Sequence, residues 1–421
     1  MLSAERNVFM TRVGPGTPMG ELFRRFWLPV SLPEQLPQPD ADPVRLRILG
    51  EDLVAFRDSN GTIGLVDAFC PHRRAPLYFG RNEECGLRCV YHGWKFDTSG
   101  TCVDMPSEPA ESNFKDKVTV RAYPTREFGG TIWAYMGPAD TVPELPMMEW
   151  ATVPDAHRRA AMWIVESNWL QVLEGNVDTS HVSFLHSAQD GIPGVREEGV
   201  LDKAPRLMVM ENEIGFAYGG RRASRDNQYY WRVTQFMLPM YTLIPGPGWP
   251  RACVGVVPID DQHCLRFQVS YNPEEAIERE PPFTPRELGS FDLPGNVTID
   301  TWLPTENRRN LYSLDRERQR HVNYSGIQGI ETQDRAMTEG MGYVCDRTQE
   351  HLGTSDLAVI AARRLLERQA TELQKGRPPL AARRHDLFGV RPLDVVSPHA
   401  TLADLVAANV EELRMPVTLS S

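Results

Sequence analysis

Two short stretches decide the fold of the N-terminal part of this sequence: CPHRRAPL at residues 70–77 and CVYHGWKF at residues 89–96. Each stretch brings a cysteine and a histidine close together. Thiolates suit zinc and iron–sulfur clusters, and imidazoles suit zinc or iron, so these ligand types alone allow a tetrahedral zinc site or a [2Fe–2S] cluster. The two stretches therefore predict a metal site built from two loops.

Short strand-like runs surround these loops. Residues 45–66 are typical of a hairpin with a Ser-Asn-Gly turn, and residues 118–137 supply two more strands around a Gly-Gly turn. A proline-rich stretch with little periodicity follows at residues 138–155. We therefore expect an all-β domain, with an N-terminal extension, over residues 1–145.

The pattern changes in the rest of the chain. Helix-like sequence is followed by strand-like runs within residues 207–270, then by a proline-rich, loop-like region at 272–306. Residues 354–376 return to the apolar spacing of a helix. We therefore expect a second domain of the α+β class over residues 146–421.

A second group of chemically active residues follows the pattern E-x3-D-x2-H-x4-H and consists of Glu174, Asp178, His181 and His186. At ~100° per residue the two histidines point in different directions on a regular helix, so the helix must distort or end between them. The pattern lacks the HExxH spacing of zinc proteases. Alone, such residues are more often surface or core residues than ligands, but they suit the 2-His-1-carboxylate site of a non-haem Fe(II) oxygenase, with one further carboxylate from elsewhere.

The two groups together resemble the Rieske non-haem iron oxygenases, closest to their phthalate dioxygenase branch. The resemblance covers nearly the whole chain and includes TRVGPGTPMGELFRRFWLPV at 11–30 and DRTQEHLGTSDLAVIAARR at 346–364. It implies an α+β protein in which an all-β Rieske [2Fe–2S] domain precedes a helix-grip (START-like) catalytic domain with an antiparallel sheet and helices.

The resemblance implies how the cluster is held. Cys70 and Cys89 bind one iron, while His72 and His92 bind the other. Neutral imidazoles in place of two thiolates raise the reduction potential of such a cluster to roughly −150 to +300 mV.

The resemblance also implies a mononuclear Fe(II) held by His181, His186 and an aspartate on a later helix. Asp334 in the stretch GIETQDRAM is the best match for this third ligand. Glu331 and Glu339 are the less favoured substitutes.

In this family the residue at the position of Asp178 connects the mononuclear iron to a cluster histidine of the neighbouring subunit, which by position is His92. Such a link implies a head-to-tail ring, and a homotrimer is the expected closed form. Glu174 is left open between an ordinary polar helix residue and a residue near the iron.

The sequence contains neither a G-x-G-x-x-G dinucleotide motif nor a plant-type cysteine run, so oxidation of the nicotinamide must occur on a separate flavin/[2Fe–2S] NAD(P)H reductase. The expected reaction uses O2 to cis-dihydroxylate a small, phthalate-like aromatic carboxylate. Two alternatives stay open: a demethylase or angular dioxygenase acting on an aryl-ether carboxylate, and a non-catalytic Rieske electron carrier. Arg206 and Arg232 lie in expected pocket strands and resemble carboxylate-binding arginines of this branch.

Composition excludes several other functions. The net charge is −11 without a basic tract, which disfavours nucleic acid as a partner. No run of about 18 apolar residues predicts a membrane span, and the first residues lack the apolar core of a secretory signal. The seven cysteines are an odd number in a long chain and argue for reduced thiols or metal ligands, so the cytoplasm is the expected compartment.

Overall fold

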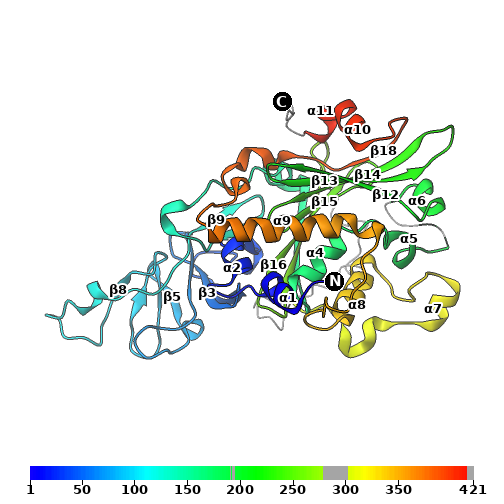
Figure 1. Cartoon of the computed structure of the whole chain (residues 1–421). Coiled ribbons are helices and arrows are strands. Elements are labelled where there is room, and N and C mark those ends of the chain that lie inside the picture. The colour runs from blue at the N-terminus through cyan, green and yellow to red at the C-terminus, as the bar shows by residue number, and fades with distance from the viewer. Residues whose placement is uncertain (190, 192–194, 278–301, 415–421) are drawn as a thin grey trace.

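The computed structural model describes residues 1–189, 191, 195–277 and 302–414. The loop-like region predicted at 272–306 therefore lies mostly outside the described residues. Figure 1 shows a smaller β part at one end of the molecule and a larger part of strands and helices at the other.

The smaller part contains short antiparallel sheets, as predicted. One sheet has the order β1-β10-β9, a second β2-β3-β4 and a third β5-β6-β7-β8. Their strands are β1 (Trp27–Ser31), β2 (Val44–Ile48), β3 (Glu51–Arg57), β4 (Ile63–Asp67), β5 (Arg81–Glu83), β6 (Gly86–Arg88), β7 (Lys95–Phe96), β8 (Cys102–Asp104), β9 (Thr125–Phe128) and β10 (Thr131–Tyr135). The hairpin expected at 118–137 is confirmed, because β9 and β10 pair across Gly129 and Gly130, whose φ angles of +62° and +69° suit glycine.

The larger part is built on an eight-stranded antiparallel sheet of order β11-β17-β16-β15-β14-β13-β12, with β18 paired to β14. Its strands are β11 (Arg158–Val165), β12 (Arg206–Asn212), β13 (Gly215–Ala223), β14 (Tyr229–Met237), β15 (Tyr241–Ile244), β16 (Arg251–Pro258), β17 (Cys264–Tyr271) and β18 (Leu393–Ser397). β-branched and aromatic residues dominate β14, and both β14 and β17 are almost wholly buried. The fold class predicted from the sequence is therefore confirmed.

Helices cover and extend this sheet. They are α1 (Ala4–Thr11), α2 (Pro18–Phe23), α3 (Glu149–Thr152), α4 (Trp169–Asn176), α5 (Val182–Leu185), α6 (Glu197–Leu201), α7 (Arg316–His321), α8 (Ile330–Gly340), α9 (Leu357–Gln374), α10 (Leu402–Ala408) and α11 (Val410–Leu413). Helix α9, predicted from its apolar spacing, lies across the sheet in Figure 1 and contacts both β12 and α2. The N-terminal helices α1 and α2 thus pack on the larger part, and the boundary near residue 145 stays a prediction.

Among the described residues, two larger hydrophobic cores and a small cluster of Tyr312, Ile327 and Ala336 support the predicted metal regions. A large core includes residues of both parts, such as Trp27, Trp133 and Trp163. A smaller core, which includes Val54, Leu87 and the predicted ligand Cys70, lies directly behind the cluster loops. Within the described residues, none of the helices combines the length and the apolar content needed to cross a bilayer.

Candidate metal centres

The two predicted cluster loops share one backbone arrangement. In the first loop the amide of Cys70 donates to the carbonyl of Ala75, and the amide four residues after Cys70 donates back to its carbonyl, each at 2.9 Å. The second loop repeats both bonds around Cys89, with the carbonyl of Trp94 at 2.8 Å and the amide of Gly93 at 2.9 Å. Each cysteine is therefore held from both sides by its own loop.

Gly93 is required by the second loop. Its φ angle is +79°, and a Cβ atom added there would lie 2.6 Å from Cγ of Pro106. Real Cβ atoms do not approach carbon so closely, and L side chains rarely adopt this backbone conformation. The glycine in CVYHGWKF thus lets Pro106 cover the loop.

Of the four predicted ligands, the two cysteine thiols are buried and the two imidazoles are more exposed. Cys70 and Cys89 are 1% and 3% exposed. The rings of His72 and His92 meet edge to face with centroids 4.4 Å apart, and Trp94 stacks on His72 at 4.4 Å. Burial and the nearby Cys89 raise the pKa of the Cys70 thiol to about 11, so a bound cation is needed to hold Cys70 as a thiolate.

The spacing of these donors separates the two metal alternatives. Ligand atoms around a tetrahedral zinc lie about 3.5 Å apart. In the described part of the chain, His181, His186 and Asp334 bring three donor atoms within 4.8 Å of one another. The four predicted ligands of the two loops do not form such a group. The loop donors are therefore spaced more widely than the ligands of one zinc ion, as is expected of donors shared between the two irons of a [2Fe–2S] cluster.

The second predicted site forms where α4 ends. Asn168 caps the start of α4 by accepting from the amide of Leu170 at 3.1 Å. After α4, Asp178 accepts from the amides of Ser180 (2.6 Å) and His181 (3.3 Å) and so makes the turn that leads into α5. His181 directly precedes α5 and His186 directly follows it. The expected interruption between the two histidines is present, because α5 ends at Leu185.

These histidines meet Asp334 from the distant helix α8. Nε2 of His181 lies 3.1 Å from Nε2 of His186, and Oδ1 of Asp334 lies 3.6 Å and 3.2 Å from those nitrogens. Ligands at right angles around an ion ~2.1 Å away are about 3 Å apart. The three side chains therefore fit one face of a six-coordinate iron and leave positions open.

Each imidazole has a partner on its other nitrogen. Nδ1 of His181 is 3.2 Å from Oδ2 of Asp178, and Nδ1 of His186 is 2.6 Å from Oε1 of Gln333. Burial acts to raise the pKa of Asp178, but the hydrogen bonds from His181 and from backbone amides hold it below its usual value. The sequence reasoning identified Asp178 and missed Gln333, although Gln333 directly precedes the predicted ligand Asp334.

The other candidate carboxylates are engaged elsewhere. Glu331 pairs with Arg266 at 3.2 Å. Glu174 pairs with Arg347 at 2.9 Å and Arg363 at 2.6 Å. These ion pairs favour the reading of Glu174 as a structural residue of α4.

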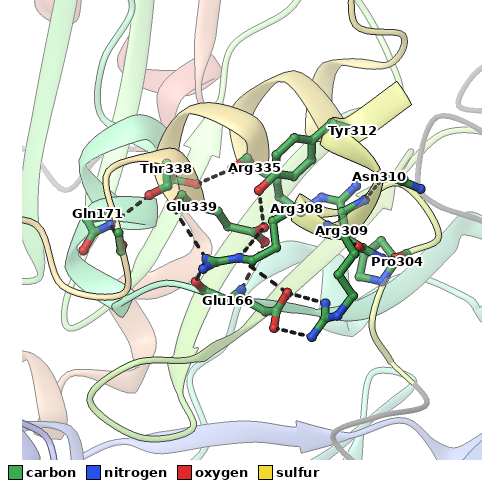
Figure 2. A network of polar contacts seen from close by, with 12 residues as sticks. Glu166, Gln171, Pro304, Arg308, Arg309, Asn310, Tyr312, Arg335, Thr338 and Glu339 are labelled. Carbon is green, nitrogen blue, oxygen red and sulfur yellow. Dashed lines mark hydrogen bonds and ion pairs between the residues drawn. The ribbon is translucent and has the colours of Figure 1, made fainter. Parts of the chain in front are cut away.

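Glu339 belongs to a buried network on the far turn of α8, shown in Figure 2. Its carboxylate accepts from the hydroxyl of Tyr312 at 2.6 Å and from the amide of Glu166 at 3.1 Å. Glu166 in turn binds Arg309 through two hydrogen bonds of 2.8 and 3.0 Å. Among the three candidates for the third ligand, only Asp334 lies close to the ring nitrogens of both histidines.

A cavity of about 250 Å³ opens beside the three donors. Its lining includes Asp178, His181, His186 and Asp334, and the strands β14, β16 and β17 contribute three arginines, Arg232, Arg251 and Arg266. Arg206, predicted as a substrate ligand, lies outside this lining and is exposed at the start of β12. Of the two predicted arginines, the structure brings only Arg232 to the cavity.

Arg232 is buried beside a backbone carbonyl and a carboxylate. Its guanidinium donates to the carbonyl of Pro245 at 2.7 Å and lies 3.6 Å from Asp394. Asp394 is shared with Arg196, whose Nε donates to it at 2.5 Å. Burial and the nearby Arg232 lower the pKa of Arg222, which is buried outside the cavity lining. This part of the cavity wall can attract an anion.

A second hollow, of about 790 Å³, lies on the outer side of the same donors and also includes Asp178, His181 and Asp334 in its lining. Exposed apolar side chains line it, among them Phe184, Tyr324, Met337 and Met341. The three-donor site thus borders both the 250 Å³ cavity and this second hollow, the outer groove. Figure 1 shows α5 and α8 at one end of the molecule and β5 and β8 at the other. The cluster loops belong to the end with β5 and β8.

Comparison with protein families divides the chain into the same two regions. A family described as Rieske [2Fe-2S] domain matches residues 26–124, and one described as LigXa C-terminal domain like matches residues 134–393.

Comparison with individual proteins extends this likeness. The phthalate 4,5-dioxygenase oxygenase subunit of Pseudomonas putida is 42% identical over 89% of this chain and 88% of its own length. The 5,5'-dehydrodivanillate O-demethylase oxygenase subunit of a Sphingobium species is 32% identical over 98% of this chain and 91% of its own. A solved oxygenase and ferredoxin complex of carbazole 1,9a-dioxygenase superposes with a TM-score of 0.56 at 18% identity, over 87% of this chain and 95% of the other, which shows the common fold.

Proposed function

This chain belongs to the Rieske non-haem iron oxygenases, and from this premise we propose that it hydroxylates a small aromatic carboxylate resembling phthalate. It is an enzyme and the oxygenase component of a multicomponent system. Its cofactors are a Rieske [2Fe–2S] cluster and a mononuclear iron. A non-catalytic electron carrier is thereby excluded.

We propose the ligands that the resemblance to this family implies. Cys70 and Cys89 hold one iron of the cluster, and His72 and His92 hold the other. The proposed mononuclear ligands are His181, His186 and Asp334. The mutual distances of 3.1 to 3.6 Å between the donor atoms of this second set support its assignment. When bound, the mononuclear iron activates O2 with electrons that reach it through the cluster.

The buried guanidinium of Arg232 in the wall of the 250 Å³ cavity is the observation that supports an acidic substrate. A planar guanidinium grips a carboxylate with paired hydrogen bonds, and a low-dielectric wall strengthens that attraction. A cavity of this size is slightly below the ~300–1,000 Å³ of pockets for drug-sized ligands, which favours a single-ring compound. Arg232 would then orient the ring toward the three donors.

We propose cis-dihydroxylation as the reaction, with O- or N-demethylation or angular attack on an aryl ether as the second candidate. The second candidate is favoured by the 32% identity to an O-demethylase subunit over 98% of the chain. Both reactions require the same two metal sites, so cavity contacts decide between them.

Products formed from labelled O2 test the reaction. A panel of benzoates, phthalates, aryl ethers and methylated heterocycles is first screened for substrate-stimulated NADH consumption. A dihydrodiol with two labelled oxygen atoms supports dihydroxylation, whereas a phenol released with an aldehyde supports demethylation. The absence of oxygenated product from every acidic ring compound would overturn the proposed substrate class.

We also propose a homotrimer in which His92 of one copy meets Asp178 of the next, with electrons supplied by a flavin/[2Fe–2S] NAD(P)H reductase. Two observations support this arrangement. The cluster loops and α8 lie at opposite ends of the folded molecule, and Asp178 is part of the lining of the apolar outer groove. A head-to-tail contact of this kind closes into a ring. Sedimentation velocity tests the trimer, and a purely monomeric active enzyme would refute it. The cytoplasm stays a prediction from the cysteine content.

A further inference from the structure

The two iron-binding histidines face chemically different partners. His181 faces the carboxylate of Asp178 at 3.2 Å, whereas His186 faces the amide of Gln333 at 2.6 Å. A carboxylate carries a full negative charge and an amide carries none, so the two imidazoles differ in the electron density that they pass to a bound metal.

The direction of each hydrogen bond around Gln333 follows from a backbone carbonyl. The carbonyl oxygen of Ile327 can only accept, and Nε2 of Gln333 lies 2.8 Å from it, so the NH2 end of the amide points there. Oε1 of Gln333 therefore faces His186 and must accept from Nδ1–H. In the neutral ring, this hydrogen bond leaves Nε2 of His186 as the nitrogen that can bind a metal beside Asp334.

The carbonyl of Ile327, at the end of this chain of hydrogen bonds, is itself held in place. Ile327 is 4% exposed, and its carbonyl also accepts from Nδ2 of Asn323 at 2.9 Å. His186 and Gln333 are 6% and 5% exposed, so bulk water has little access to the bond between them. The orientation of His186 is thus determined by protein groups.

We propose that Gln333 is the positioning residue of His186: by accepting a hydrogen bond from Nδ1–H, it selects the tautomer whose Nε2 can bind iron. The proposal deepens the function proposed above and rests on the assignment of His186 as a ligand. Helix α8 then supplies two successive residues with different tasks, Gln333 for orientation and Asp334 for direct binding.

The test uses Co²⁺ as the probe, added to protein that keeps its Rieske cluster but has lost the mononuclear metal. We expect Gln333→Leu to bind Co²⁺ about 10 to 100 times more weakly than wild type, because the imidazole loses its acceptor. Gln333→Glu keeps an acceptor, so we expect it to bind at least as tightly as wild type and to shift the Co²⁺ d–d absorption bands. Wild-type affinity and bands in Gln333→Leu would overturn the proposal, as would equal weakening in both variants.

Gln171→Leu is the matched control. Gln171 is 2% exposed and donates to the carbonyls of Thr338 and Gly342 at the other end of α8, away from the histidines. It should lower the melting temperature and leave Co²⁺ affinity unchanged; affinity loss matching that of Gln333→Leu would point to helix packing and overturn the proposal. His186→Ala separates the two hypotheses, because undiminished Co²⁺ binding there refutes the ligand assignment itself, and with it any role of Gln333.

Discussion

The two metal sites of this chain are assembled in opposite ways. All proposed cluster donors lie between Cys70 and His92 on two loops that close with the same local backbone hydrogen bonds. The mononuclear donors lie as far apart in sequence as His181 and Asp334 and meet only because α4, α5 and α8 pack together. A local site depends on loop geometry, whereas a site from distant segments depends on the packing of the whole domain.

The largest expected effect comes from removing one ligand of each site in turn. Wild type should hold about three irons per chain, two in the cluster and one mononuclear. Asp334→Ala should lose the mononuclear iron, keep the visible absorption of the cluster and lower product formation by more than about 1,000-fold, because the iron activates O2. Cys89→Ser should lose the cluster and keep the mononuclear iron. Iron analysis with absorption spectroscopy checks both, and loss of the cluster in Asp334→Ala would contradict the independence of the two sites.

Asp178→Asn should keep both metals and still lose most product formation, on the order of 100-fold. The asparagine can retain the contact to His181 but cannot carry the negative charge that faces the ring at 3.2 Å. Iron content and product yield are measured on the same sample. Wild-type turnover in this variant would refute the role of Asp178 as the electronic link between copies.

Arg232→Leu should weaken kcat/KM for acidic substrates on the order of 100-fold, since a buried charged contact is lost. Neutral ring compounds should be affected far less. Arg206→Leu is the matched control, because Arg206 is exposed and lies outside the cavity lining, and it should stay near wild type. Equal losses in the two variants would argue against Arg232 as the carboxylate ligand.

The smallest effect concerns the loop backbone. Gly93→Ala should destabilise the cluster region by about 1–3 kcal/mol, from backbone strain and the contact with Pro106. Gly376→Ala tests strain alone, because Gly376 has a similar φ of +78° and open space around it. The rate of cluster bleaching during thermal unfolding should rise in the first variant only.

Most of the cluster region could be predicted because its information is local. Cysteine and histidine spacing, the glycine of CVYHGWKF and the hairpin at 118–137 all concern neighbours in the chain. Asp334 was predictable only through the resemblance of its surrounding stretch to a known family. Among the arginines, strand position could not distinguish Arg206 from Arg232, because the sheet alone decides which strand faces the cavity.

The fold class and the end of the helix before His186 could be predicted from the sequence alone, because they depend on residue chemistry and short-range backbone geometry. Tertiary structure decided the rest: that Gln333 meets His186, that Glu174 is bound by two arginines, and that three arginines line one cavity. The physical reason is that hydrogen bonds and ion pairs act over a few ångströms in space, and spacing along the chain does not encode which distant segments approach that closely.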